Sequence, residues 1–340
     1  MDTTFLTDLY TDLCDEYKRW EDTHRLTNGL FWQYDVRDGM EESISGARKQ
    51  QNARPTINSY MYGNAMALAQ IAELMGKTAD AELYRQKAAE TKLLIEARLW
   101  NAQHQFFETV RGDTCAQVRE AIGYLPWYFN LPSKEYSEAW KQLNDEKGFS
   151  APYGLTTAER RHPEFRTHGV GQCEWDGAIW PFATAQTLTA LANYLNHSET
   201  PVVTDSTFFR QMQLYVESQH HRGRPYIGEY LDEVTGYWLK GDQERSRYYN
   251  HSTFNDLVIT GIAGLRPRAD KSIEVNPLVP EGQWDYFCLD NVRYHGHNIT
   301  ILWDRNGDRY HQGRGLRVLV DGRLAGQSDT LMRLICKDVL

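Results

Sequence analysis

The sequence has few cysteines and no arrangement of them that would hold a metal. They are odd in number and widely separated along the 340 residues: Cys14, Cys115, Cys173, Cys288 and Cys336. Without a CxxC pair or zinc-ligand spacing, we expect mostly buried free thiols. His220-His221 and His295-x-His297 have no acidic residue at ligand spacing, so packing or surface roles are expected. Phosphate-loop and dinucleotide-binding motifs are also missing, and no cofactor or metal is predicted.

Long apolar runs and a basic surface are missing too. No stretch approaches the ~18 uninterrupted apolar residues of a membrane-spanning helix. The net charge is −9 and the basic residues are dispersed, which argues against nucleic acid or an anionic membrane as partners. The first residues, MDTTFLTDLYTDL, lack signal-peptide features. Location stays open, periplasmic or secreted if a further N-terminal segment precedes the chain and cytoplasmic otherwise, and the oligomeric state is not predicted.

Aromatic residues are abundant by contrast. The chain has 10 Trp and 20 Tyr, and most of them must pack in the core. Aromatic faces also stack on the C–H faces of sugar rings. Four tryptophans lie beside acidic residues or glycines and are singled out as candidate sugar contacts: Trp32, Trp175, Trp180 and Trp238.

The hydrophobic pattern predicts a mainly α chain with a β appendage. Helices are expected over 4–22, 59–76, 79–99, 116–129, 133–146, 177–196, 204–220 and 252–263. Long loops are expected over 27–58, 147–176 and 221–250. After Pro267, alternating apolar residues with Asn306-Gly307 and Asp321-Gly322 predict antiparallel hairpins.

These elements indicate two domains. We expect an (α/α)6-toroid-like catalytic domain over 1–267 and a small antiparallel, β-sandwich-like module over 268–340. The expected helices are too few for six helical hairpins. The toroid is therefore expected to be incomplete, or to be the C-terminal part of a longer domain.

Two acidic clusters lie about 190 residues apart. The first is Asp38-Gly39-Met40-Glu41-Glu42-Ser43, and the second is Gly228-Glu229-Tyr230-Leu231-Asp232. Sugar hydrolysis needs one carboxyl group that holds a proton and a second that is ionised. Crowded carboxylates hold protons more readily, which fits the first cluster but leaves Asp38, Glu41 and Glu42 open as the acid. In the second cluster Glu229 could activate a water, while Asp232 and Glu233 are expected at the surface.

Three segments together resemble a known family. Gly39-Met40-Glu41-Glu42-Ser43 is similar to the Gly-aromatic/Met-Asp-x-Ser motif of α/α-toroid glycoside hydrolases, which include family 63 glucosidases, mannosylglycerate hydrolases and trehalases. Glu174-Trp175-Asp176-Gly177-Ala178-Ile179-Trp180-Pro181 resembles their Trp-x-Gly-Pro-x-Trp segment, which lines the sugar site. Glu229-Tyr230 with Thr235-Gly236 resembles their base motif, and Tyr249-Asn250-His251-Ser252 resembles the entry to their last barrel helix.

The resemblance implies a glycoside hydrolase that cleaves an α-glycosidic bond with inversion. Glu41 would be the acid and Glu229 the base, with the carboxyl groups about 6.5–9.5 Å apart. Glu41 stands where better-known members have Asp, and the family's arginine after the serine is missing, with Arg48 and Arg54 as candidate substitutes. A carbohydrate is the expected partner, and the expected substrate-binding residues are Trp32, Asp38, Arg54, Trp175, Asp176, Trp180, Trp238 and His251.

Other interpretations remain open. Asp176 is alternatively expected to cap a helix with Pro181 in its first turn. A toroid polysaccharide lyase or sugar epimerase would need Tyr60, Tyr62 and His251 to converge. A non-catalytic glycan-binding protein would keep only the tryptophans. Carboxylates of Glu41 and Glu229 more than about 12 Å apart would exclude the hydrolase.

Overall fold

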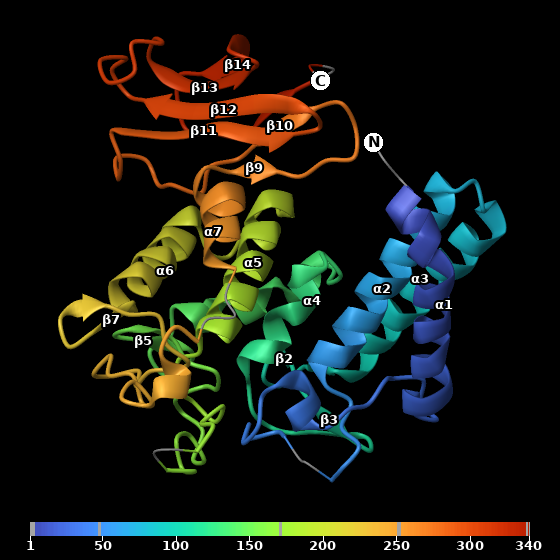
Figure 1. Cartoon of the computed structure of the whole chain (residues 1–340). Coiled ribbons are helices and arrows are strands. Elements are labelled where there is room, and N and C mark those ends of the chain that lie inside the picture. The colour runs from blue at the N-terminus through green and yellow to red at the C-terminus, as the bar shows by residue number, and fades with distance from the viewer. Residues whose placement is uncertain (1–3, 47–48, 170–171, 250–252, 338, 340) are drawn as a thin grey trace.

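The computed structural model describes residues 4–46, 49–169, 172–249, 253–337 and 339. The α-helices are α1 (Thr4–His24), α2 (Pro55–Leu74), α3 (Thr78–Arg98), α4 (Leu125–Tyr128), α5 (Pro181–His197), α6 (Asp205–Ser218) and α7 (Phe254–Leu257). The 3-10 helices are η1 (Asp35–Asp38), η2 (Ala121–Tyr124), η3 (Lys134–Leu143) and η4 (Glu244–Ser246), and η5 (Val258–Ile262) is a π-helix. Helices α1–α3 lie together on one side of the molecule and α4–α7 on the other (Figure 1).

The long helices form where the apolar period predicts them, but two of their starts differ. Helix α2 begins earlier than expected, at Pro55, and α5 begins later, at Pro181. Both starts follow from proline chemistry, because the fixed backbone angle of proline suits the first helical position and its missing N–H is not needed there. Gly76, with φ 71°, ends α2 as a left-handed residue that donates its N–H to the Glu73 carbonyl at 3.0 Å.

The two shorter expected helices are confirmed only in part. Residues 116–120 are not helical, the one-turn helix α4 follows η2, and the helix expected over 133–146 is the 3-10 helix η3. Tight packing fixes the position of η2. A Cβ on Gly123 would lie 2.3 Å from the Phe106 ring, so η2 is pressed against the strand β2 (Phe106–Phe107).

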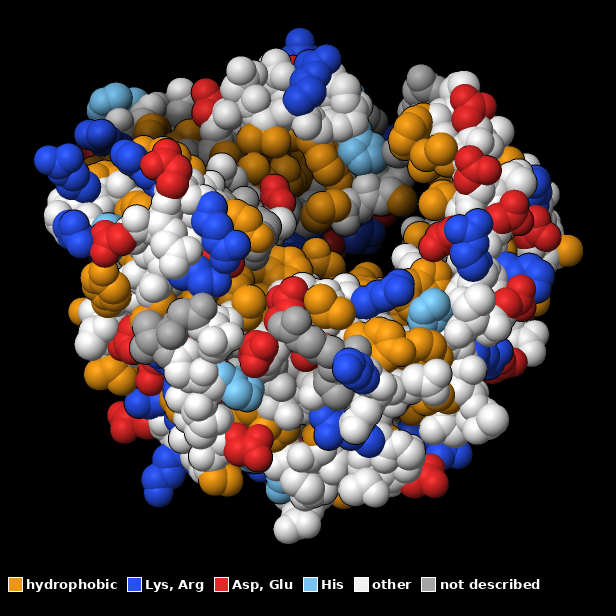
Figure 2. Space-filling view, turned by 60° about the horizontal axis from the view of Figure 1, so that its bottom comes forward, with side chains coloured by type: hydrophobic (Ala, Val, Ile, Leu, Met, Phe, Trp, Pro, Cys, Tyr) orange, Lys and Arg blue, Asp and Glu red, His pale blue; other side chains and the backbone are white. Residues whose placement is uncertain are grey.

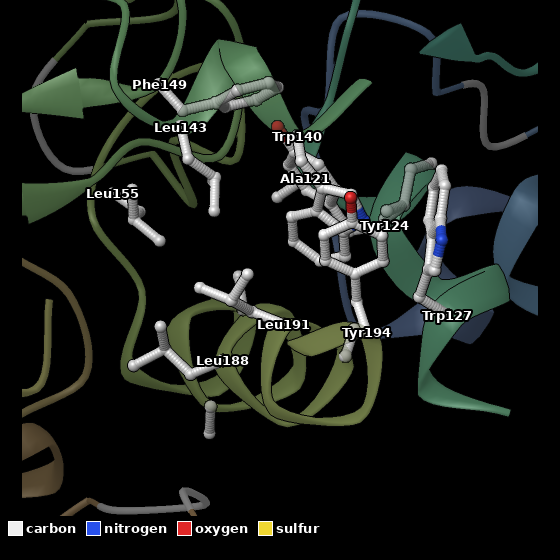
Figure 3. Packing of buried hydrophobic residues seen from close by; sticks show 14 of the residues in the cluster. Ala121, Tyr124, Trp127, Trp140, Leu143, Phe149, Leu155, Leu188, Leu191 and Tyr194 are labelled. Carbon is white, nitrogen blue, oxygen red and sulfur yellow. The ribbon is translucent and has the colours of Figure 1, made fainter. Parts of the chain in front are cut away.

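An aromatic core fixes α5 in place. Figure 3 shows Leu188, Leu191 and Tyr194 of this helix directed toward the cluster that contains Tyr124 and Trp140. The Trp140 ring stacks at 4.5 Å on Tyr124 and at 5.3 Å on Tyr194. Aromatic side chains bury large areas and hold defined orientations. The core therefore positions the start of α5 and the segment that precedes it.

The predicted β module is present. Strands β11 (Tyr286–Tyr294), β12 (His297–Asp304), β13 (Gly315–Val320) and β14 (Arg323–Ser328) form one antiparallel sheet in sequence order. Strands β9 (Leu265–Arg266), β10 (Ile273–Val275) and β15 (Leu334–Cys336) form a second sheet with β10 in the middle. Asp321-Gly322, with φ of 47° and 79°, forms the predicted two-residue turn. Asn306-Gly307 instead lies in the longer loop 305–314, so a tight turn there is wrong.

The helical part also contains four short two-stranded hairpins among its described residues. They pair β1 (Trp100–Asn101) with β2, β3 (Val110–Arg111) with β4 (Thr114–Cys115), β5 (Ser150–Ala151) with β6 (Gly154–Leu155), and β7 (His220–His221) with β8 (Arg224–Pro225). Among the residues described, no helix is long and apolar enough to cross a membrane.

The long loops gather at one end of the molecule. The described parts of three loops, 25–46 with 49–54, 147–169 with 172–180, and 221–249, all lie at the end of the helices away from the β module (Figure 1). A single β-bridge from Ile179 to Leu231 ties the second loop to the third, and a second bridge from Leu231 to Trp238 lies within the third loop. The face on which these loops lie is hollowed, with hydrophobic side chains inside the hollow and acidic side chains among them (Figure 2). The fold thus brings the three motif-bearing segments to one surface.

Candidate active site

The first acidic cluster follows the short helix η1. Gly39, with φ 68°, ends that helix, and Met40 donates its N–H to the Asp35 carbonyl at 3.2 Å. The Met40 side chain is buried, whereas Glu41 and Glu42 are half-buried. This tight turn therefore anchors its apolar residue inside and leaves the two glutamates at the border between protein and solvent.

Asp38 lies deeper than its neighbours and is held entirely by protein groups. Its side chain is 1% exposed. Its carboxylate accepts hydrogen bonds from the Arg54 guanidinium, from the Gln33 amide and, at 2.8 Å, from the Thr56 hydroxyl. Burial raises the pKa of Asp38, and the positive charge of Arg54 opposes that rise. Asp38 therefore links the loop that carries Glu41 to the buried side chains of Arg54, Gln33 and Thr56.

Arg54 is the centre of a buried charge network. Its side chain is fully buried, and its guanidinium also donates to the hydroxyl oxygens of Ser43 at 3.4 Å and Ser45 at 3.5 Å. Ser45 in turn donates its N–H to the Glu120 carboxylate at 3.2 Å. Burial raises the pKa of Glu120, and the Arg54 charge lowers it. One guanidinium thus serves two buried carboxylates, Asp38 and Glu120.

Nothing in the sequence pointed to Glu120. It lies 66 positions after Arg54 in an unremarkable segment, and only the packing of η2 against the first loop brings the two together. A cavity of about 10 Å³ beside them, lined in part by Ser43, Thr157 and Gln186, has room for about one water molecule.

The second acidic cluster places Glu229 directly after Gly228, which is packed tightly between two aromatic rings. A Cβ on Gly228 would lie 2.3 Å from the Trp238 ring and 2.5 Å from the Tyr226 ring. The Glu229 carboxylate accepts a hydrogen bond from the Ser246 hydroxyl at 2.9 Å, and its other oxygen lies 3.8 Å from Lys240 Nζ. The carboxylate is therefore oriented from two sides, and its side chain remains 10% exposed.

The charges of Glu41 and Glu229 reach the same two groups. Burial raises the pKa of the Cys173 thiol, Lys240 lowers it, and Glu41, Glu229 and Glu42 raise it further. Burial likewise raises the pKa of Tyr249, followed by the charges of Glu229 and Glu41. Coulomb interactions weaken with distance. Glu41 and Glu229 therefore both lie near Cys173 and Tyr249, although they are far apart in the sequence.

Two of the singled-out tryptophans form a continuous ring stack with a tyrosine. The Trp175 and Trp180 rings lie 4.2 Å apart at 17°, and Trp180 and Tyr230 lie 4.6 Å apart at 14°. All three residues are buried, so their faces mostly cover one another. The stack joins the segment before α5 to the residue that follows Glu229. It therefore ties the second and third motifs together rigidly.

The other two tryptophans lie elsewhere. Trp238 is buried and donates its indole N–H to the His220 carbonyl at 2.9 Å. Trp32 is half-buried, stacks on His24 at 4.7 Å and meets the Tyr34 ring at 5.2 Å. Trp32 is therefore the most accessible of the four tryptophans, whereas the Trp238 ring packs against Gly228.

The acidic residues near these motifs have structural partners. Asp176 is buried and accepts the His168 N–H at 3.0 Å. The expectation that Asp176 caps α5 is wrong, because the capping position is Trp180 and no side chain caps that helix.

Arg166 forms ion pairs with the acidic residues near Glu229. Its guanidinium pairs with Glu233 at 2.6 Å, with Glu174 at 2.9 Å and with Asp232 at 3.4 Å. Glu233 is buried, so its expected surface position is wrong. Among the predicted site residues, His251 lies outside the described residues, as does Arg48.

Among the described residues, no group of three or more His, Cys, Asp or Glu side chains is placed so that it could hold a metal ion.

Comparisons with known proteins match both parts of the chain. Residues 1–252 match the model of the mannosylglycerate hydrolase MGH1-like glycoside hydrolase domain, and residues 265–325 match the C-terminal domain of glycosyl hydrolase family 65. A solved structure of a protein named sialidase is 69% identical with a TM-score of 0.98 over 100% of this chain. This chain spans only 32% of that protein, so the name sialidase refers to a much longer molecule.

More distant structures are also similar. Mannosylglycerate hydrolase of family 63 from Thermus thermophilus, in complex with glucose, is 18% identical with a TM-score of 0.44, covering 55% of this chain and 44% of that one. Neutral trehalase from Saccharomyces cerevisiae is 17% identical with a TM-score of 0.42, covering 56% and 36%. Likenesses at this level carry no argument about the site.

Proposed function

This chain belongs to the family of mannosylglycerate hydrolase MGH1-like glycoside hydrolase domains, and on that premise we propose that it hydrolyses an α-glycosidic bond in an oligosaccharide or glycoside with inversion at the anomeric carbon. Glu41 is the proposed general acid and Glu229 the proposed general base. The observation that carries this proposal is the convergence of both carboxylate charges on Cys173 and Tyr249.

The proposed reaction uses each carboxyl group once. Glu41 gives its proton to the glycosidic oxygen as the bond from that oxygen to the anomeric carbon breaks. Glu229 takes a proton from a water whose oxygen attacks the anomeric carbon from the opposite face. Inversion requires room for this water, so the two carboxyl groups should lie about 6.5–9.5 Å apart.

The surroundings of the two glutamates support these different roles. Ser246 and Lys240 place a hydrogen bond and a positive charge beside Glu229, and both stabilise a carboxylate. Glu41 follows Met40 on a turn braced by the buried network of Arg54, Asp38 and Glu120. A braced turn holds a proton donor in a fixed position, which general acid catalysis needs.

The proposed scaffold is an (α/α)6-toroid-like domain over residues 1–267 with a β-sandwich-like module over 268–340. The packing of α2 on α3, and of α4 and α6 on α5, supports helical hairpins. For substrate contacts we retain Trp32, Asp38, Arg54, Trp175, Asp176, Trp180, Trp238 and His251. Trp32 is the first of these to test, because the other three tryptophans are buried.

A lyase or epimerase is less well supported. Such an enzyme needs a tyrosine or histidine base, and burial followed by the Asp38 charge raises the pKa of Tyr60. Tyr60 also accepts a hydrogen bond from the Gln186 amide at 3.0 Å. Burial raises the pKa of Tyr62 as well. Both phenols therefore hold their protons more tightly than a free tyrosine.

Proton NMR of the first sugar released tests the proposal. The chain is incubated with α- and β-linked aryl glucosides and mannosides, and the anomer is recorded before mutarotation. We expect hydrolysis of an α-glycoside with a β-anomer as first product. Retention of configuration would refute the base role of Glu229, and binding without release of sugar would favour a glycan-binding protein.

A further inference from the structure

A groove rich in arginine lies beside the segment 244–248, whose Ser246 holds the proposed base. Arg222, Arg224, Arg247, Tyr226, Tyr248 and Asp242 are among the residues that line it, and its volume is about 500 Å³. Ligand pockets generally measure about 300–1,000 Å³. The chain as a whole carries a net charge of −9, whereas three arginines gather on this one groove. We call this feature the cationic groove.

Two of the three arginines are available to a ligand. Arg222 is paired with Asp242 at 2.9 Å, and Asp242 also accepts from the Tyr237 hydroxyl at 2.9 Å. In the described part of the chain, no carboxylate lies within ion-pair distance of Arg224 or Arg247. The other ionisable groups on the groove are His221 and Glu244. Arginine presents its donors in a fork that matches a carboxylate.

An exposed tyrosine stands beside these arginines in an uncommon conformation. Tyr248 is 67% exposed and has a φ of 65°, which bulky residues seldom adopt. Its N–H donates to the Ile227 carbonyl at 2.9 Å, and the Arg247 guanidinium lies 5.1 Å from the centre of its ring. Backbone strain of this kind collects at binding sites. The ring is therefore held outward, where a sugar face can stack on it.

The groove continues past Tyr248 and touches the proposed catalytic machinery. Tyr226 and Tyr248 also line an adjoining groove of about 590 Å³. The Tyr226 hydroxyl donates to the Ser246 carbonyl at 3.2 Å, and the Ser246 side chain holds Glu229. The segment 244–248 thus presents Ser246 to the base and Arg247 with Tyr248 to the groove. A chain bound there would lie beside the segment that holds Glu229.

We propose that the cationic groove binds a carboxylate-bearing unit, a uronic acid, of the glycan next to the sugar whose bond is cleaved. Arg224 and Arg247 bind the carboxylate and Tyr248 stacks on the sugar ring. The position of this unit along the substrate rests on the proposed hydrolase function, whereas its binding does not. The groove therefore selects acidic over neutral glycans.

Calorimetric titration tests the proposal without turnover. The probes are trisaccharides of galacturonate, glucuronate and mannuronate, each compared with its carboxyl-reduced neutral counterpart. We expect at least one acidic chain to bind about tenfold more tightly than its neutral form, as one charge-assisted contact provides. Arg224→Gln and Arg247→Gln should each weaken that binding about tenfold. Tyr248→Asn, which keeps a residue tolerant of positive φ, should weaken acidic and neutral chains alike.

Arg210→Gln is the matched control. Arg210 is an exposed arginine on α6 that does not line the groove, so its removal should leave every affinity unchanged. Equal binding of all acidic and neutral pairs would overturn the proposal, as would unchanged affinity in both groove arginine variants. Because no hydrolysis is measured, these outcomes are independent of the tests of Glu41 and Glu229. A hydrolase without acidic preference would refute the groove alone.

Discussion

Replacing Arg54 by methionine should destabilise the protein strongly, because it removes the buried cation whose charge offsets the carboxylates of Asp38 and Glu120. Removing one partner of a buried ion pair costs about 3–5 kcal/mol. Arg54 is fully buried and serves two carboxylates and two serine hydroxyls, so the upper part of that range is expected. A typical domain has about 5–15 kcal/mol of stability in total, and the loss is therefore a large share of it.

Urea unfolding at neutral pH measures this loss against a matched surface variant. Arg85→Met removes an arginine that pairs with Glu73 at 2.6 Å, with both side chains largely exposed. Such pairs contribute about 0–1 kcal/mol. The double variant Arg54→Met with Asp38→Asn should be more stable than Arg54→Met alone, because one uncompensated carboxylate is gone. A loss below about 1 kcal/mol for Arg54→Met, or no gain in the double variant, would refute the buried network.

Two further predictions concern Glu120 and Gly228. Burial raises the Glu120 pKa above its ordinary value of 4.5. Between pH 4.5 and that raised pKa the folded state binds more protons than the unfolded state, so stability falls as pH rises. Glu120→Gln should therefore gain unfolding free energy relative to wild type from pH 4.5 upward, and a pH-independent difference would contradict this. Gly228→Ala should cost about 1–3 kcal/mol by overpacking against Trp238 and lower activity by displacing Glu229, whereas Gly322→Asn, in an open left-handed turn, should stay within about 0.5 kcal/mol. Equal unfolding free energies for these two glycine variants would contradict the packing argument.

The elements that could be predicted from sequence are those with a repeating apolar face. Helices α1, α3 and α6 have long amphipathic or apolar faces, and their ends were found nearly as predicted. The helix predicted over 116–129 is found only as η2 and α4, and Gly123 of η2 packs closely against Phe106. Local sequence is a weak guide wherever tertiary packing overrides propensity.

The candidate site was only partly predictable for the same reason. Motif resemblance and motif order pointed to Glu41 and Glu229. The partners that orient these segments come from elsewhere in the chain. Ser246 reaches Glu229 across 17 positions, and Glu120 meets Ser45 across 75. Trp175 stacks on Trp180, which in turn stacks on Tyr230, and composition cannot reveal this arrangement.

The central claim is that Glu41 and Glu229 form one catalytic pair, and the turnover of single variants tests it most directly. Release of sugar is measured for wild type, Glu41→Gln, Glu229→Gln and Glu42→Gln on the best glycoside of the panel. Loss of a catalytic acid or base generally lowers the rate about 10²–10⁴-fold. We predict such a loss for Glu41→Gln and Glu229→Gln and near wild-type turnover for Glu42→Gln. Unchanged turnover in either of the first two variants would contradict the assignment.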